Sequence, residues 1–235
     1  MPDPSLRRAF WLGCRDGLPF LLVIVPFGLL FGVVAGEAGW SLAETMAITV
    51  LVIAGASQFT AVQLYSDHAP TLIIIVTSLA VNLRMAMYSA SLAPYIGAAP
   101  RWQRALAAYA LTDQSYGAAM NRYAMKTRMN LPQRMAHFFG VALPVCIPWY
   151  LSTWAGAVAG AAIPPALALD FAVPVTFLAL VGPALRSLPH VAAALVSVVV
   201  SLALAWLPYN LWLLVAAVLA MATGALVEAW QERRR

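Results

Sequence analysis

A run of seventeen residues without a charged side chain, FLLVIVPFGLLFGVVAG at positions 20–36, is the feature that most limits how this chain can fold. Similar runs recur along the chain, so that 63% of its 235 residues are hydrophobic and only 10% are charged. Soluble domains are about 45–50% apolar and about 25% charged, and could not bury this much apolar surface. The runs also lack the alternation of membrane β-barrel strands. The sequence therefore predicts an all-α integral membrane protein.

Transmembrane helices need about 20 apolar residues each. Apolar segments of about this length predict a polytopic bundle of seven to eight transmembrane helices in a single transmembrane domain covering residues 1–235. The basic segment 1–16 and the basic tail 231–235 are predicted to be cytoplasmic. The predicted spans are 17–35, 42–63, 71–93, 104–122, 137–161, 170–186, 190–207 and 209–230. We expect the last of these to pack as antiparallel hairpins, because only short connections separate them.

The distribution of basic residues favours an N-terminus and a C-terminus that both lie in the cytoplasm. With eight spans, eleven basic residues fall on the cytoplasmic side, whereas Arg101 and Arg104 fall outside and conflict with the rule. A re-entrant second span would reverse the topology of all the later spans. The net charge of +5 suits a membrane surface better than nucleic acid, because no basic stripe is interleaved with aromatic residues.

Prolines interrupt several predicted spans, where they remove a backbone hydrogen bond and kink or break the helix. Broken helices in both halves of a chain are typical of transporters with a binding site at the membrane midplane, although ordinary kinked helices explain the prolines equally well. The segments VPFGLLFG (25–32) and VPVTFLALVGP (173–183) match loosely and suggest an inverted repeat.

The stretch AGASQF (54–59) combines very small and polar residues in the middle of the second predicted span. Gly55 and Ser57 allow another backbone to come close, and Gln58 offers hydrogen-bond donors and an acceptor. One interpretation is a tight helix crossing. The favoured interpretation is an unwound turn whose backbone groups hold a substrate, because small and polar residues coincide.

Asn82 and Arg84 lie within the third predicted span. They point to different sides of a helix, and Arg84 shares its side with Tyr88. Inserting an arginine at the centre of a membrane helix costs about 2.5–3.5 kcal/mol. An ion pair with a nearby anion would offset part of this cost. If the helix ended near Tyr88, Arg84 would instead reach the interface.

Asp113 is the one acidic residue predicted well inside a span, within YALTDQSYGAA (109–119). In a continuous helix Tyr109, Asp113 and Tyr116 would share one face, with Thr112 and Ser115 beside it. Arg84 is the predicted counter-ion. The pair could be purely structural, but a charge that binds an ammonium group or carries a proton is the favoured hypothesis.

Sequence signatures of enzymes are missing. No HExxH or nucleotide-binding loop occurs, and Ser57 has no histidine at a comparable depth to act as its base. We therefore expect no catalytic residue, no metal site and no cofactor, with an intramembrane serine enzyme as the weakest alternative. Cys14 and Cys146 are expected to be unpaired.

Four segments, VPFGLLFGVVAGEAG, LVIAGASQFTAVQL, VNLRMAMYSASLAPYI and LTDQSYG, together resemble the AzlC family of branched-chain amino acid permeases across residues 13–230. The resemblance implies a subunit of the bacterial inner membrane that exports branched-chain or other hydrophobic amino acids with a small membrane partner, AzlD. Met85 and Gln114 stand where the family pattern often has histidine and glutamate. Both departures remove an ionisable group and leave Asp113 as the main titratable candidate.

The first functional hypothesis is therefore a secondary-transporter subunit in which Gln58 and Arg84 meet the substrate and Asp113 meets its ammonium group or a coupling proton. The alternative is a membrane scaffold or receptor subunit whose polar residues bind a partner helix. The predicted substrate-binding or coupling residues are Gly55, Ser57, Gln58, Asn82, Arg84, Tyr88, Thr112, Asp113 and Ser115, with Phe27, Phe59, Tyr109, Gln114 and Tyr116 as further candidates.

Overall fold

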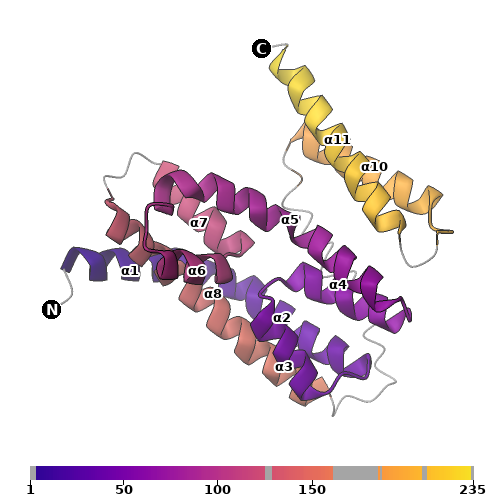
Figure 1. Cartoon of the computed structure of the whole chain (residues 1–235), viewed down its shortest axis with the longest axis horizontal. Coiled ribbons are helices and arrows are strands. Elements are labelled where there is room, and N and C mark those ends of the chain that lie inside the picture. Colours follow the sequence, from indigo (N-terminus) through magenta and orange to yellow (C-terminus); the bar gives the residue numbers. More distant parts are fainter. Residues whose placement is uncertain (1–3, 125–128, 161–184, 186, 208–210, 234–235) are drawn as a thin grey trace. The chain divides into compact units, whose positions relative to one another are not determined.

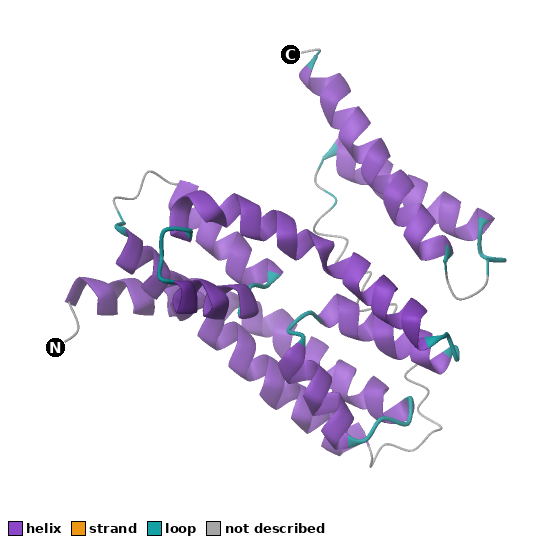
Figure 2. Cartoon of the chain, in the orientation of Figure 1, coloured by secondary structure: helices purple, strands orange, loops and turns teal. Residues whose placement is uncertain are grey.

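The computed structural model describes residues 4–124, 129–160, 185, 187–207 and 211–233, which form helices joined by short turns (Figures 1 and 2). Within these residues, four helices are long and apolar enough to cross a membrane: Ser5–Glu37, Thr71–Ile96, Leu131–Gly160 and Trp212–Gln231. The prediction of an all-α membrane protein is confirmed. Predicted span 170–186 falls almost entirely outside the described residues, and so does segment 173–183 of the suggested repeat.

The chain forms two compact units, one built from Met1–Val62 and Val81–Pro164, the other from Gln63–Ala80 and Pro165–Arg235. In the second unit, α10 (Leu188–Ala203) packs along α11 (Trp212–Glu232). Gly224, late in α11, lies against Ala193, early in α10, so the two helices are antiparallel as predicted. The first unit holds all the residues predicted for the functional site.

A long helix pair forms the frame of the first unit. The helices α1 (Pro4–Gly17), η1 (Leu18–Phe20) and α2 (Leu21–Glu37) follow one another and pack along α8 (Leu131–Gly160). Glycines allow this close approach, because a Cβ on Gly13 would overlap the backbone of His137 and a Cβ on Gly32 that of Thr153. Since early residues face early residues, the two helices run parallel. The prolines within α2 and α8 do not interrupt them.

The predicted span 42–63 consists of two half-helices, α3 (Leu42–Leu51) and α4 (Gly55–Ser66), separated by the non-helical residues 52–54. Phe59 of α4 contacts Phe27 and then Phe31 of α2, at ring-centroid distances of 4.8 and 5.4 Å, and Gly55 also lies against Phe27. The first part of α4 therefore runs parallel to α2, whereas a continuous span after α2 would run antiparallel to it. The chain enters and turns back, so the prediction of one crossing helix here is wrong.

The predicted span 104–122 is also two half-helices, α6 (Arg101–Tyr109) and α7 (Asp113–Ala124), separated by residues 110–112. Helix α7 runs parallel to the second half of α5 (Thr71–Ile96), because Tyr88 stacks on Tyr116 at 4.2 Å and Tyr95 packs on Tyr123 at 5.6 Å. It thus returns to the end of α5 at which α6 began. The predicted shared face of Tyr109, Asp113 and Tyr116 is therefore wrong, because the helix breaks between the first two.

The two re-entrant hairpins enter the first unit from opposite ends (Figure 1). Tyr123 at the end of α7 donates to the Arg134 carbonyl at 2.7 Å, and Arg134 donates to the Tyr95 carbonyl at 3.3 Å. The end of α5 therefore lies at the start of α8, which makes α5 antiparallel to α8 and α2. The α6–α7 hairpin enters where α8 begins, whereas the α3–α4 hairpin enters where α2 ends.

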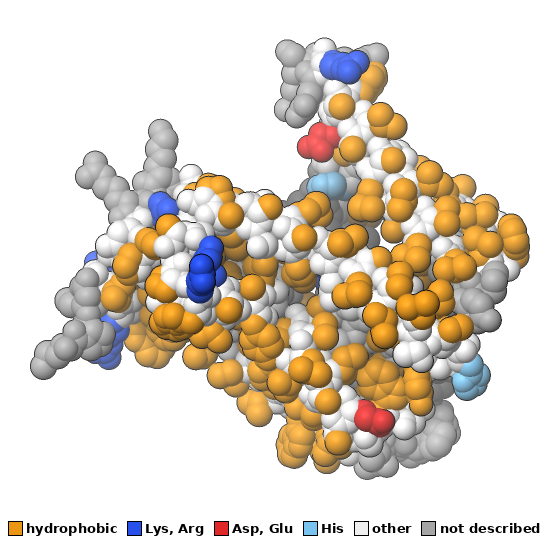
Figure 3. Space-filling view, in the orientation of Figure 1, with side chains coloured by type: hydrophobic (Ala, Val, Ile, Leu, Met, Phe, Trp, Pro, Cys, Tyr) orange, Lys and Arg blue, Asp and Glu red, His pale blue; other side chains and the backbone are white. Residues whose placement is uncertain are grey.

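This arrangement gathers the positive charge of the first unit at one end (Figure 3). Apart from Arg84, its described basic residues lie on α1, at the start of α6, at the end of α7 and at the start of α8; they are Arg7, Arg8, Arg15, Arg101, Arg104, Arg122 and Arg134. The prediction that Arg101 and Arg104 lie opposite the other basic residues is wrong, because the re-entrant α6–α7 hairpin returns them to the same end.

Candidate substrate site

The tips of the two hairpins meet beside α8 of the first unit. The Tyr109 hydroxyl, at the end of α6, donates to the Val50 carbonyl near the end of α3 at 2.6 Å. The Tyr150 hydroxyl of α8 lies 2.9 Å from the Tyr109 hydroxyl and, because that group has already donated its hydrogen, serves as the donor. Two chain breaks that are 58 residues apart in sequence, at 52–54 and 110–112, are thereby held together on α8.

An ion pair lies at the tip of the second hairpin. Arg84 Nη2 is 3.2 Å from Asp113 Oδ2, as the sequence predicted, and the Tyr88 hydroxyl donates to Asp113 Oδ1 at 2.8 Å. Asp113 is the first residue of α7, where the helix dipole favours a negative charge. The side chains of Arg84 and Asp113 are 32% and 39% exposed, so both charges remain accessible to a ligand.

Gln58 secures the tip of the first hairpin. It is fully buried, and its amide nitrogen donates to the Val52 carbonyl at 2.6 Å and to the Ile48 carbonyl at 3.3 Å. The Ile48 carbonyl also accepts from the Val52 amide, and the Val52 carbonyl also accepts from the Ala54 amide, so Gln58 reinforces backbone hydrogen bonds at the end of α3. Its Oε1 atom is buried and accepts no hydrogen bond from any described residue. Gln58 therefore stabilises the break and offers one acceptor to a ligand.

Thr112 and Ser115 form the cap that starts α7. The Thr112 amide donates to Ser115 Oγ at 2.8 Å, and the Ser115 amide donates to Thr112 Oγ1 at 3.2 Å. Ser115 Oγ also donates to the Ala110 carbonyl at 3.0 Å. Both side chains are buried, and their polar atoms are engaged by the break itself. Their contribution is to shape the turn that presents Asp113.

An aromatic cluster stands behind the first break. Phe27 and Phe31 of α2, Phe59 of α4 and Trp149 of α8 are all buried and contact one another. Gly55 fits against this cluster because it lacks a side chain: a Cβ there would come within 2.7 Å of Phe27 Cε1. The predicted apolar residues Phe27 and Phe59 thus form a packed wall beside the hairpin tip.

The remaining predicted residues differ in their surroundings. Tyr116 is stacked on Tyr88, Ser57 is buried near the start of α4, and Gln114 is half-buried next to Asp113. Asn82 Oδ1 and Arg84 Nε are buried and have no hydrogen-bond partner among the described residues. Open polar atoms on both hairpins and on α5 give the site the capacity to bind a molecule that carries both donors and acceptors.

A second charged cluster, which sequence reasoning missed, ties the far end of α7 to the frame. Arg122 donates two hydrogen bonds from Nη2 to Asp16, at 2.7 and 2.9 Å, and a third from Nε at 3.1 Å. His137 Nε2 lies 2.9 Å from the same carboxylate, and the His137 side chain is fully buried. The three residues join α1, α7 and α8 and fix where the second hairpin is anchored.

Fold and site together define an integral membrane protein with two opposed re-entrant hairpins and an accessible ion pair at the tip of one of them. The family model described as "AzlC protein" matches residues 19–163, and the chain belongs to the AzlC family.

Three relatives are membrane proteins. Inner membrane protein YgaZ of Escherichia coli (strain K12) is 29% identical over 184 residues, which cover 75% of this chain and 74% of YgaZ. An uncharacterized membrane protein of Archaeoglobus fulgidus is 30% identical over 98% of this chain and 99% of its own length. One of Helicobacter pylori (strain J99) is 27% identical over 62% of this chain and 64% of its own length. No solved structure matches the chain. Family and relatives support a membrane-transporter role.

Proposed function

We propose that this protein is a subunit of a secondary transporter that exports branched-chain or other hydrophobic amino acids across the bacterial inner membrane. Two observations carry the proposal: a hydrogen bond from Tyr109 to Val50 joins the two opposed re-entrant hairpins, and an accessible Arg84–Asp113 ion pair lies at the tip of the second one. Non-helical backbone at membrane depth is tolerated where it lines a protein or aqueous cavity, and broken helices form the substrate sites of many secondary transporters.

The charges at the site suit a zwitterion. An amino acid inserted between Arg84 and Asp113 would place its carboxylate on the guanidinium and its ammonium on the carboxylate, replacing one ion pair by two without changing the net charge. The buried Gln58 Oε1 can accept a further hydrogen bond from the ammonium group. We assign contact with the apolar substrate side chain to Phe27 and Phe59, which form the packed wall beside the tip of the first hairpin.

The orientation of the protein in the membrane rests on charge, and the proposed direction of export rests on the resemblance to the AzlC permeases. The positive-inside rule puts the end that carries Arg7, Arg101, Arg122 and Arg134 in the cytoplasm, together with the N-terminus. We further propose that a small AzlD-like membrane subunit completes the transporter, that no cofactor takes part, and that the protein is not an enzyme.

A scaffold role is the second candidate, and the closed Arg84–Asp113 pair favours it in one respect: the two charges already satisfy each other. Exchanging them (Arg84→Asp with Asp113→Arg) separates a structural role of the pair from a role in binding substrate. If the exchanged variant recovers both the assembly and the export that each single variant loses, the pair is structural. If it recovers assembly without export, each charge meets its own part of the substrate.

The direct test is transport in proteoliposomes, with and without a pH gradient and with and without the partner subunit. Leucine, isoleucine and valine should move, and glycine or glutamate should not. Wild-type protein that moves none of these amino acids, alone or with its partner, would refute the proposal.

A further inference from the structure

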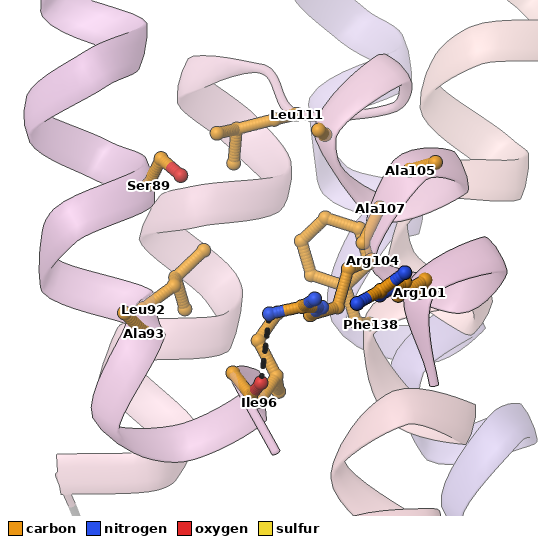
Figure 4. Close-up of a pocket in the computed structure, with 12 residues that line it drawn as sticks. Ser89, Leu92, Ala93, Ile96, Arg101, Arg104, Ala105, Ala107, Leu111 and Phe138 are labelled. Atoms are coloured by element: carbon orange, nitrogen blue, oxygen red, sulfur yellow. Dashed lines mark hydrogen bonds between the residues drawn. The ribbon is translucent and has the colours of Figure 1, made fainter. Parts of the chain in front are cut away.

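A cavity of about 390 Å³ lies between the end of α5 and the first half of the second hairpin. Its α5 wall contains Leu92 and Ile96, its α6 wall contains Ala105 and Ala108, and Phe138 of α8 closes the back (Figure 4). Small alanine side chains on α6 leave the space open. The volume is within the range of small-molecule sites, about 300–1,000 Å³.

Two arginines stand at the outer end of this cavity. Figure 4 shows Arg104 reaching across toward α5, where its Nη1 donates to the Gly97 carbonyl at 3.3 Å, with Arg101 beside it. Neither arginine forms an ion pair with a described residue, in contrast to Arg84 and Arg122. A mainly apolar chamber therefore ends in two unneutralised positive charges, an arrangement that suits a molecule with an anionic head and an apolar body.

The inner end of the cavity approaches the hairpin tip. Ser89 and Leu111 line it there. Ser89 follows Tyr88, which hydrogen-bonds Asp113, and it lies five residues after Arg84, about 7.5 Å along α5 at 1.5 Å per residue. Leu111 belongs to the break that precedes Asp113. The cavity thus leads from the basic end of the unit to within about one and a half helical turns of the ion pair.

From these observations we infer that the α5–α6 cavity is a second, outer binding site, which takes a hydrophobic amino acid from the basic side before it reaches Arg84 and Asp113. Arg104, with Arg101, holds the carboxylate. Leu92, Ala108 and Leu111 contact the apolar side chain. The inference rests on the proposed function for the identity of its ligand. An anionic lipid shares the same chemistry, and the experiment separates the two sources.

The test measures reaction of a cysteine placed in the cavity. Ala108→Cys is made after Cys14 and Cys146 are replaced by alanine, and Ala124→Cys, at the exposed end of α7, is the matched control. In nanodiscs of zwitterionic lipid, a negatively charged thiol reagent should modify Ala108→Cys faster than a positively charged one. Arg101→Gln and Arg104→Gln should each lower the rate with the negatively charged reagent about fourfold, the effect of one unit charge about 5 Å away in water. The control should show no such change.

Protection of Ala108→Cys from the thiol reagent decides whether the cavity binds a hydrophobic amino acid or an anionic lipid. Millimolar leucine should slow modification of Ala108→Cys at least threefold, glycine should have little effect, and Arg104→Gln should abolish the protection. Protection by anionic lipid in the nanodisc with none by leucine would overturn the inference, and so would a reaction insensitive to both arginines. Transport by the wild-type protein is measured in parallel. If the wild-type protein transports leucine but leucine does not protect Ala108→Cys, only the inferred outer site is refuted. If the wild-type protein transports nothing, the proposed function itself is refuted.

Discussion

Removing the negative charge of Asp113 tests the proposed site while leaving its shape almost unchanged. Asp113→Asn keeps an oxygen that can accept from the Tyr88 hydroxyl, which lies 2.8 Å from Oδ1. At the 3.2 Å separation from Arg84, two unit charges attract by about 5 kcal/mol at an effective dielectric constant of about 20. Because both side chains are about one-third exposed, solvent screens this attraction, and we expect a loss of folding stability of about 1–2 kcal/mol.

The effect on export should be larger than the effect on stability. Without Asp113, the substrate ammonium loses its charged partner while Arg84 stays unpaired. Loss of one charge-assisted hydrogen bond of about 2 kcal/mol corresponds to an export rate reduced about thirtyfold. The assay is leucine export from proteoliposomes, with thermal unfolding in detergent as the check on folding. Glu44→Gln, which removes an exposed acid at the start of α3, is the matched control and should export normally.

Export by Asp113→Asn within twofold of the wild-type rate would refute the reasoning, because the charge would then play no part in transport. Equal losses in Asp113→Asn and Glu44→Gln would also contradict it, because the effect would then follow from net charge and not from the site.

Three further predictions concern how the hairpins are held. Tyr109→Phe removes the hydrogen bond to the Val50 carbonyl and should lower the unfolding free energy by about 1–2 kcal/mol and slow export. Tyr150→Phe keeps that bond and should have the smaller effect. A larger effect of Tyr150→Phe would argue against contact between the two hairpin tips. Gly55→Ala should destabilise by about 1–3 kcal/mol in thermal unfolding, because its Cβ would crowd Phe27, whereas Gly117→Ala meets nothing within 4 Å and should be neutral or stabilising. Asp16→Asn should lower stability by about 1–3 kcal/mol by weakening the anchor of α7, and an unchanged unfolding temperature would contradict that role.

The Arg84–Asp113 pair could be predicted from the sequence because charges are rare in apolar segments and each demands a partner. The hairpins could not, because hydropathy and length treat a segment that turns back like one that crosses. The second break did leave a local signal: Thr112 followed by Ser115 three residues later is a helix start, which places Asp113 at the first position of a new helix. An unwound turn was expected within AGASQF (54–59), but the break covers residues 52–54, and Gly55, Ser57 and Gln58 belong to helix α4, so the predicted position of the break is wrong.

The Asp16–Arg122–His137 cluster had no comparable signal. Its members are separated by 106 and 121 residues, and each taken alone looks like an ordinary polar residue near a membrane surface. Only the return of α7 to the basic end brings Arg122 beside Asp16, so this cluster depends on the same topology that the span prediction missed.

That topology is the central claim, and thiol accessibility tests it directly. Ala98→Cys, in the exposed turn between α5 and α6, and Ala124→Cys, at the end of α7, are each made after the two native cysteines are replaced. A membrane-impermeant thiol reagent is then applied to one side of the membrane at a time. If segment 101–124 is a re-entrant hairpin, both cysteines react from the cytoplasmic side only. Reaction of the two cysteines from opposite sides would show that the segment crosses the membrane and would contradict the opposed hairpins on which the proposed site rests.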